Sequence, residues 1–445
     1  MIIRTTIKKI LGALLVCLSI TSCSENQNDE ILSESNINYS IQAPLEIYIV
    51  TDIHYLSNNI NDKGVAFQKM VDSSDGRLIK YISELTDAFV YEILENKPDI
   101  LIISGDLTHN GEKESHLELA EKLKEIENNG TKVYVVAGNH DINNPYAREF
   151  KGSEQVITEF VTPLEFEKIY SEFGYDEAYM RDKNSLSYLA TPTEDLWVLM
   201  LDTNIYEQNV SYPITNGQIS KETLEWIKEC SNIAKENNAE IITVMHHNLY
   251  KHSEILYKGF TLDNYEEVLS VFKECELNIV FSGHIHIQDI MADAGENVFD
   301  VVNSSFIMYP VQYGKININT DGLIYNTELV DVEKWAEDFN VKNNELLDFN
   351  DFSKDYFFEA SSLKTFNELM VTGLYSEEVA KKMADTMALL NINYFGGTTD
   401  EIREEVTESE GYKLWLESEN SFLKYYVIDM SEENANDNNY LKIND

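Results

Sequence analysis

Short runs of apolar residues recur between residues 47 and 281. They occupy residues 47–50, 100–103, 133–136, 197–201, 241–245 and 279–281. Runs of this length, bounded by Asp, Gly or Asn, are typical of buried strands. Between two of them, Leu119, Leu123 and Ile126 have helical spacing, and Asn129-Gly130 follows as a C-cap. The alternation of strands and helices predicts an α/β domain.

From about Val298 the pattern changes to consecutive strands. Alternating apolar residues at 316–318 and 323–325 flank Asp321-Gly322, which is a hairpin signal. We expect these strands to close the α/β part near Val332, in a sheet that could pack on the first one.

After Val332 the strand signals stop. Ser376 can cap a helix whose apolar residues between 379 and 390 have helical spacing, and Gly396-Gly397 can end it. Thr398 and Glu401 then have the spacing of a capping box. We expect a small all-α C-terminal domain over residues 332–445. Its Asn-rich tail, which includes Asn434, Asn436, Asn438 and Asn439, is predicted to be frayed.

The N-terminal residues have the pattern of an export signal. Basic residues at 4, 8 and 9 precede an apolar stretch at 10–18 that is too short to span a bilayer comfortably. Ile20-Thr21-Ser22-Cys23 resembles a bacterial lipoprotein signal, which implies a signal peptide over residues 1–22 and a lipidated Cys23. Residues 23–43 would be a flexible tether. The expected location is therefore the outside of a bacterial membrane; an ordinary secretory signal or a retained anchor are the alternatives.

The charge of the chain narrows its possible partners. Asp and Glu number 78 against 34 Lys and Arg, giving a formal net charge of −44. Such a surface repels nucleic-acid backbones, so polymeric DNA or RNA is excluded as a partner. A small anionic substrate remains possible where bound metal ions reverse the local field. Apart from Cys17 in the signal and Cys23 at the lipidation site, the chain has only Cys230 and Cys275, and we expect two buried thiols rather than a disulfide framework.

Five groups of metal-binding side chains directly follow predicted strands. They are Asp52-Ile53-His54, Gly105-Asp106, Gly138-Asn139-His140-Asp141, His246-His247 and Gly283-His284-Ile285-His286. Strand ends of an α/β sheet face the usual ligand crevice, and carboxylates and neutral imidazoles suit first-row metals. In an extended stretch, side chains two residues apart point to the same side and could reach one site. Burying so many Asp and His residues without partners would cost several kcal/mol each.

The ordered set resembles the pattern of calcineurin-like metallophosphoesterases over residues 44–331: Asp-x-His, Gly-Asp, Gly-Asn-His-Asp, His, Gly-His-x-His. Each motif alone is weak, but the full ordered set is specific. The resemblance implies a two-sheet sandwich flanked by helices, with a dinuclear metal site that hydrolyses phosphoric esters.

The family roles carry over by position. The first metal would be held by Asp52, His54 and His286. The second would be held by Asn139, His246 and His284. Asp106 would bridge the two metals, and a hydroxide between them would be the nucleophile, because metals lower the pKa of bound water. His140 would protonate the leaving oxygen and, with Asn139, bind the substrate. The ligand types suit Mn²⁺, Fe²⁺/Fe³⁺ or Zn²⁺.

Several residues near the motifs are not assigned as ligands. Asp141 is expected to be a turn residue or to support the ligands. His247 should point away from His246, and the alternatives for it are a structural role and a place in the cleft. His116 and His252 are expected to be solvated. His109 stands where many family members carry an Asp that orients the catalytic His, so either His109 or another group must orient His140.

Asp202, after the run at 197–201, is expected to act in a turn.

The motifs also bear on the substrate. Residues 105–111 lack the Arg of protein phosphatases and the Tyr ligand of purple acid phosphatases. The closest resemblance is to bacterial class III cyclic-nucleotide phosphodiesterases with a helical C-terminal domain, which implies a small phosphodiester substrate, such as a nucleotide. Aromatic residues between 143 and 184 could wall the cleft or pack only against one another. The alternatives are a broad phosphomonoesterase or nucleotidase, and a lipid-anchored binding protein with a degenerate site.

Overall fold

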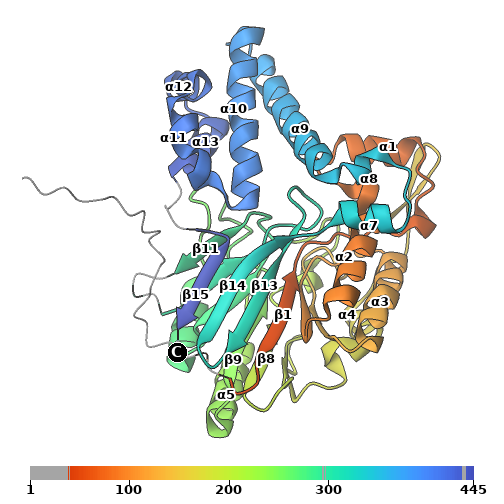
Figure 1. The fold of residues 1–445 in the computed structure, drawn as a ribbon, viewed down its shortest axis with the longest axis vertical. Helices are drawn as coiled ribbons and strands as arrows, with labels where there is room; N and C mark the ends of the chain where they lie inside the picture. The colour runs from red at the N-terminus through yellow and green to blue at the C-terminus, as the bar shows by residue number, and fades with distance from the viewer. Residues whose placement is uncertain (1–38, 40, 293–294, 296, 433–436, 445) are drawn as a thin grey trace, which may run out of the picture.

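The computed structural model describes Tyr39 and residues 41–292, 295, 297–432 and 437–444. The expected signal peptide and the lipidation site at Cys23 lie outside these residues. Within the described part of the chain, no helix is both long and apolar enough to cross a membrane. Figure 1 shows two sheets at the centre, with helices beside them and a helical region above.

The first sheet combines parallel and antiparallel strands. It contains β1 (Leu45–Val50), β2 (Ile100–Ser104), β3 (Lys132–Val136), β13 (Gln312–Asn319), β14 (Gly322–Leu329) and β15 (Tyr440–Asn444). Their order is β15-β14-β13-β1-β2-β3. β1 to β3 are parallel, and β13 pairs antiparallel with β1. The hairpin around Asp321-Gly322 is confirmed, but it extends the first sheet beside β1 and forms no separate sheet.

The second sheet has the order β11-β12-β10-β9-β8-β7-β6. Its strands are β6 (Met180–Arg181), β7 (Tyr188–Ala190), β8 (Leu196–Leu201), β9 (Glu240–Met245), β10 (Ile279–Ser282), β11 (Asp289–Ala292) and β12 (Phe299–Val302). β8, β9, β10 and β12 run parallel. All six strands expected from the apolar runs are present, as β1, β2, β3, β8, β9 and β10. A small hairpin of β4 (Arg148–Lys151) and β5 (Glu154–Ile157) stands apart.

Alternation along the strands of the second sheet builds two apolar layers. Val198 and Val244 belong to the main core, which also contains the apolar residues of the first sheet. Leu199 and Ile241 point the other way, into a second cluster with α5 (Lys221–Asn237) and α6 (Tyr265–Cys275). Because successive side chains of a strand face opposite sides, a wholly apolar strand can be covered on both faces. The result is the expected two-sheet sandwich flanked by helices.

The remaining helices of this part precede β8. They are α1 (Val65–Asp72), α2 (Ile82–Asn96), α3 (Lys113–Asn128) and α4 (Pro163–Ile169), with short helical turns at Asn58–Ile60, Ile79–Tyr81, Ser171–Tyr175 and, after β8, Tyr206–Gln208. α3 ends before Asn129 as expected. In Figure 1, α2, α3 and α4 lie together on the right of the sheets.

Residues 332–432 are helical, as expected, but the region is not all-α, because residues 440–444 form β15 of the first sheet. It contains α7 (Val332–Asp338), α8 (Asn344–Leu347), α9 (Phe349–Thr372), α10 (Glu377–Gly396), α11 (Thr399–Glu408), α12 (Glu410–Glu417) and α13 (Phe422–Glu432). The Ser376 hydroxyl caps α10 by accepting from the Val379 amide, and Gly397 ends it with φ of 71°. α9 to α13 stand above the sheets in Figure 1.

Two further expectations for this region are wrong. α11 does follow Thr398, but the Thr398 side chain makes no capping bond; its hydroxyl donates to Asn393 Oδ1 instead. Asn434 and Asn436 of the expected frayed tail lie outside the described residues, but the described end of the chain is not frayed, because β15 pairs with β14 and buries Leu441 and Ile443. The Asn-rich sequence before β15 gives no strand signal, and the strand forms because it pairs with β14, more than a hundred residues earlier.

Candidate metal centre

The five motifs meet at one edge of the sandwich. Three follow β1, β2 and β3 of the first sheet, and two follow β9 and β10 of the second. Because β1, β2 and β3 run parallel to one another, as do β9 and β10, their carboxyl ends bring these turns together. The candidate site therefore straddles the two sheets.

The backbone at the site is not extended. The expectation that side chains two residues apart reach the same site assumed an extended backbone, and that assumption is wrong. Five of the candidate ligands have left-handed φ values: Asp52 (52°), His54 (48°), Asp106 (49°), His284 (68°) and His286 (71°). This conformation is uncommon for residues other than glycine and costs about 1–3 kcal/mol at each position. Hydrogen bonds between turns hold it, for example from the His54 amide to the Asp106 carbonyl at 2.9 Å.

The first group of ligand atoms surrounds Asp52. Asp52 Oδ1 lies 3.2 Å from His286 Nε2 and 3.6 Å from His54 Nε2, and the two ring nitrogens are 3.4 Å apart. Burial alone would raise the pKa of Asp52, but His286 and His54 bring that pKa well below its usual range. Asp52 is therefore a buried carboxylate that holds its negative charge.

The second group surrounds Asp106. His246 Nε2 lies 3.4 Å from Asp106 Oδ2 and 3.1 Å from Asn139 Oδ1. His246 Nδ1 donates to the Ser104 carbonyl at 3.0 Å, and His284 Nε2 donates to the Gly259 carbonyl at 2.7 Å. These bonds fix the tautomers, so that the lone pairs of His246 Nε2 and His284 Nδ1 remain for a metal.

Asp106 connects the two groups. Its Oδ2 atom lies 3.7 Å from His54 Nε2 on the side of the first group. Burial would raise its pKa, but His246 and His140 lower the pKa well below its usual value. Each of Asp52 and Asp106 forms part of a cluster of three metal-ligating side chains. Ring nitrogens and buried carboxylate oxygens that lie this close to one another fit two cations.

His140 lies beside this cluster. Its Nδ1 atom donates to the His109 carbonyl at 2.7 Å, and its amide donates to Asp106 Oδ1 at 2.8 Å. The Nε2 atom therefore faces the ligands, 3.9 Å from Asp106 Oδ2. The group that orients His140 is thus the backbone of residue 109, and a carboxylate is not needed there.

Comparison with family models places the chain. The model of calcineurin-like phosphoesterases matches residues 45–288. The chain belongs to this family. The model described as the C-terminal domain of cyclic nucleotide phosphodiesterase matches residues 331–437. Both agree with the resemblance inferred from the motifs, and the family is one that uses a dinuclear metal centre.

Solved structures show distant likenesses. A dimetal phosphatase from Danio rerio is 13% identical, with a TM-score of 0.45, over 64% of this chain and 95% of its own. A purple acid phosphatase from yellow lupin is 12% identical, with a TM-score of 0.41, over 65% and 52%. A putative 5'-nucleotidase from Staphylococcus aureus is 15% identical, with a TM-score of 0.38, over 65% and 54%. A search of curated proteins found no match.

Asp141 and His247 support the site of this phosphoesterase from behind. The Asp141 carboxylate accepts hydrogen bonds from the amides of Leu107, Thr108 and Gly138, at 2.8 to 3.1 Å. It thereby ties the second and third motifs together. His247 packs its ring against the His284 ring, with centroids 4.5 Å apart, while its Nδ1 atom lies 2.7 Å from the Thr203 hydroxyl and its Nε2 atom donates to the Thr215 carbonyl at 3.0 Å. These contacts agree with the supporting role expected for Asp141 and with the structural role given as one alternative for His247.

Asp202 also has the turn role expected of it, since its carboxylate accepts from the amides of Leu186 and Asn204.

The expectation that His116 and His252 are solvated is wrong. His116 is fully buried, with Nδ1 2.9 Å from the Tyr170 hydroxyl and Nε2 3.0 Å from the Asp141 carbonyl. His252 is buried between two carboxylates, 2.6 Å from Asp289 and 3.0 Å from Asp300. A polar local sequence predicts exposure only when no distant element covers it.

Four of the aromatic residues between 143 and 184 pack against one another, whereas Tyr146, Phe160 and Tyr179 are exposed. Phe166, Tyr170, Phe173 and Tyr175 are buried, with ring centroids 4.7 Å apart for Phe166 and Tyr170. None of these four lines the cleft at the candidate metal centre. Of the two alternatives, internal packing is the one that the contacts support.

The wall of the cleft comes instead from the C-terminal helices. The cleft has a volume of about 680 Å³ and is lined by Asp106, Asn139, His140, His284 and His286 on one side. Across from them stand apolar and aromatic side chains of α9, α10 and α13: Phe357, Met387, Phe395, Phe422, Leu423 and Tyr426. Sequence reasoning missed this wall, because helical periodicity shows which residues are apolar but not which surface they face.

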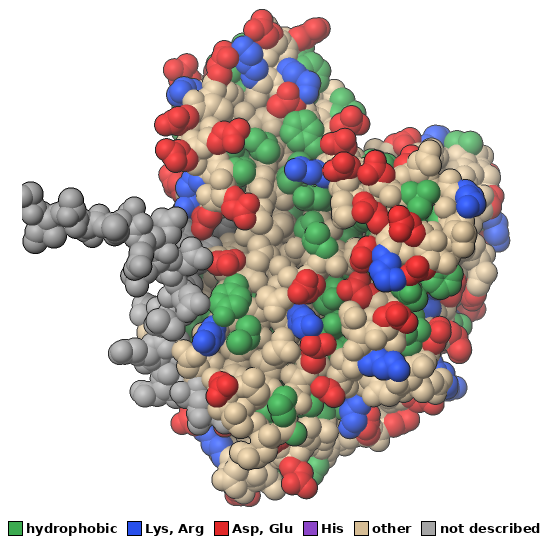
Figure 2. All heavy atoms as spheres, viewed as in Figure 1, with side chains coloured by type: hydrophobic (Ala, Val, Ile, Leu, Met, Phe, Trp, Pro, Cys, Tyr) green, Lys and Arg blue, Asp and Glu red, His purple; other side chains and the backbone are tan. Residues whose placement is uncertain are grey.

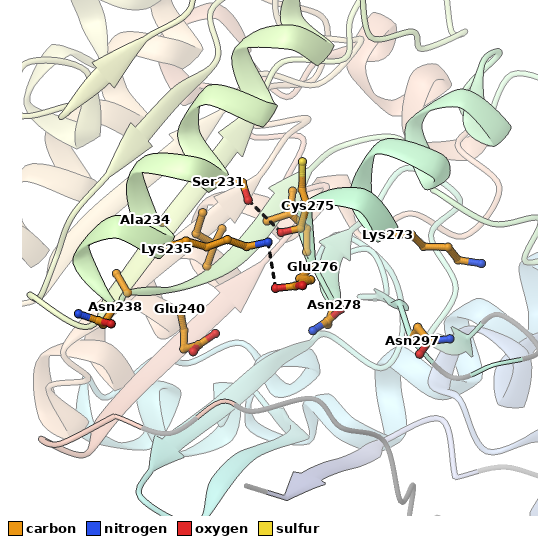
Figure 3. A pocket seen from close by; sticks show the side chains of 13 residues that line it. Ser231, Ala234, Lys235, Asn238, Glu240, Lys273, Cys275, Glu276, Asn278 and Asn297 are labelled. Atoms are coloured by element: carbon orange, nitrogen blue, oxygen red, sulfur yellow. Dashed lines mark hydrogen bonds and ion pairs between the residues drawn. The ribbon is translucent and has the colours of Figure 1, made fainter.

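A second pocket lies away from the motifs. It has a volume of about 620 Å³ at the carboxyl ends of α5 and α6 and contains none of the motif residues. As Figure 3 shows, Lys235 pairs with Glu276 there, and Ser231 donates to the Cys275 carbonyl. Cys230 and Cys275 are both buried free thiols, as expected.

Proposed function

We propose that this phosphoesterase is a dinuclear-metal phosphodiesterase acting on cyclic nucleotides or similar small phosphodiesters. The observation that carries the proposal is the convergence of two ligand groups on Asp106, with His140 Nε2 beside them. The match of residues 331–437 to the C-terminal domain of cyclic nucleotide phosphodiesterase supports the substrate class.

In this proposal Asp52, His54 and His286 would hold one metal ion. Asn139, His246 and His284 would hold the other, and Asp106 would contact both. Ions of manganese, iron or zinc suit these ligands, and when bound they would supply activated water and polarise the phosphoryl oxygens. No thiolate lies among the seven ligands.

His140 would donate a proton to the leaving oxygen. The His109 carbonyl holds the ring with a proton on Nδ1, so Nε2 is the atom that faces the cleft. A proton carried on Nε2 could pass to an oxygen lying on the His140 side of Asp106. Asn139, whose Oδ1 atom lies beside His246, would bind substrate together with His140.

The cleft favours a small substrate with an apolar part. Apolar and aromatic side chains of the C-terminal helices face the polar motifs across about 680 Å³, a volume suited to a small ligand. Acidic side chains are spread over the face drawn in Figure 2, with fewer basic ones among them. A polyanionic nucleic acid would be repelled from such a surface.

We also propose, from the sequence alone, that the protein is exported and held at a bacterial membrane by a lipid on Cys23. An acidic protein is not attracted to anionic lipids, so the lipid would supply the attachment.

The first test compares hydrolysis of bis-p-nitrophenyl phosphate and p-nitrophenyl phosphate by purified protein, after chelation and after adding Mn²⁺. Faster turnover of the diester, lost on chelation and restored by metal, supports the proposal and leads to assays with cyclic nucleotides. Turnover of the monoester alone would favour a phosphomonoesterase or nucleotidase. A metal-loaded protein that cleaves neither ester would favour a binding protein.

A further inference from the structure

Arg77 lines the cleft together with Asp106, His140 and His286, although it belongs to none of the five motifs. It stands in the turn between α1 and α2. Within the described part of the chain, its guanidinium makes no hydrogen bond or ion pair with another side chain. The guanidinium of arginine carries five donors in a planar fork, so an unpaired guanidinium in a cleft is suited to bind an anion.

Nearby carboxylates stabilise the positive charge of Arg77. Burial lowers the pKa of Arg77, and the carboxylates of Asp106, Asp52 and Asp75 act in the opposite direction. Arginine remains charged under these conditions. Once metal ions bind the carboxylates of Asp52 and Asp106, their attraction for Arg77 is offset, and a further anion would be needed to balance the guanidinium.

The turn that carries Arg77 is held from two sides. On one side the Leu78 amide donates to the Ile307 carbonyl at 2.7 Å, in the segment that follows β12. On the other side Gly76, with φ of 87°, lies so close to α9 that an added Cβ would be 2.6 Å from Phe357. Lys364 of α9 also pairs with Asp75 at 2.8 Å. The C-terminal region therefore positions the turn as well as walling the cleft.

We infer that Arg77 binds the phosphoryl oxygens of the substrate, as a specificity residue supplied by a turn that α9 holds in place. The inference rests on the proposed phosphodiesterase function and adds a residue to it. The planar fork of a guanidinium can bind two phosphoryl oxygens at once, which an ammonium group cannot. Lys364 lines the same cleft, but its charge is already paired with Asp75.

The test measures binding of inorganic phosphate to Mn²⁺-loaded protein by calorimetry, alongside hydrolysis of bis-p-nitrophenyl phosphate. The variants are Arg77→Met, Arg77→Lys and, as a control that removes the same charge from α11, Arg403→Met. Arg77→Met is expected to weaken phosphate binding by about 10-fold or more, the worth of a hydrogen bond to a charged group. Arg77→Lys should recover part of the loss, and Arg403→Met should behave as the parent protein.

Two further readouts separate binding from scaffolding. Metal content should not change in Arg77→Met, and its unfolding temperature should not fall, because an unpaired guanidinium does not stabilise the fold. Phosphate affinity equal to that of Arg403→Met would overturn the inference. So would a loss of phosphate binding that merely accompanies a loss of metal. If the parent protein hydrolysed no ester, the proposed function would fail, whereas the phosphate titration would still decide the role of Arg77.

Discussion

Gly138 is the position where one added carbon should do most harm to the candidate metal centre. A Cβ at Gly138 would lie 2.2 Å from both the amide nitrogen and Oδ1 of Asp106. An ordinary contact begins near 3.4 Å, so Gly138→Ala requires a separation of 3.4 − 2.2 = 1.2 Å. The amide nitrogen is backbone and cannot rotate away, so the Asp106 turn itself must move.

The size of this shift sets the expected effect. Metal sites tolerate ligand displacements of about 0.2 Å, and a misplacement of about 1 Å can cost about 100-fold in rate. Overpacking of this kind also destabilises a fold by about 1–3 kcal/mol. We therefore expect Gly138→Ala to fold with reduced stability, to lose metal, and to lose about 100-fold or more in turnover of bis-p-nitrophenyl phosphate.

The matched control is Gly396→Ala. An added Cβ there would approach no atom closer than 3.8 Å, and the residue lies in the last turn of α10. Alanine in a helix is favoured over glycine by up to about 1 kcal/mol, so this variant should be as stable as the parent or more so. The assays are metal content by mass spectrometry, ester turnover and urea unfolding. Metal content and turnover in Gly138→Ala equal to those of Gly396→Ala would refute the reasoning.

Three further predictions concern other parts of the molecule. His140→Ala should lower diester turnover by about 100- to 10,000-fold at unchanged metal content, and a loss below tenfold would contradict its role in proton transfer. The pKa of His252 is raised to about 10, where burial opposes protonation but Asp300 and Asp289 favour it. The stability that protonated His252 contributes should be complete below about pH 6.5 and lost as the pH rises through 10. The free energy of urea unfolding should therefore depend less on pH in this range for His252→Asn than for the parent protein. Equal pH dependence in the two proteins would argue against the ion pairs of His252 with Asp289 and Asp300. Ile443→Ala should lower the unfolding free energy by about 2–5 kcal/mol, because Ile443 of β15 is fully buried; an unchanged urea midpoint would mean that β15 does not stabilise the sheet.

The sequence by itself determined the parts of this protein that local patterns encode. Short apolar runs gave the six main strands, because a wholly buried strand must be apolar on both faces. The metal-binding residues follow those strands directly, so parallel strands carry them to one edge. The start of α10 was equally local, since the Ser376 hydroxyl bonds an amide three residues along.

Only the tertiary structure decided which side chains are covered and what faces the site. His252 is buried by Asp300, 48 residues away, and β15 is paired with a strand more than a hundred residues earlier. The cleft wall of α9, α10 and α13 and the placement of Arg77 depend on the same kind of contact. Periodicity along a chain states which face of an element is apolar. It does not state which distant element packs there, because that choice follows from the packing of the whole molecule.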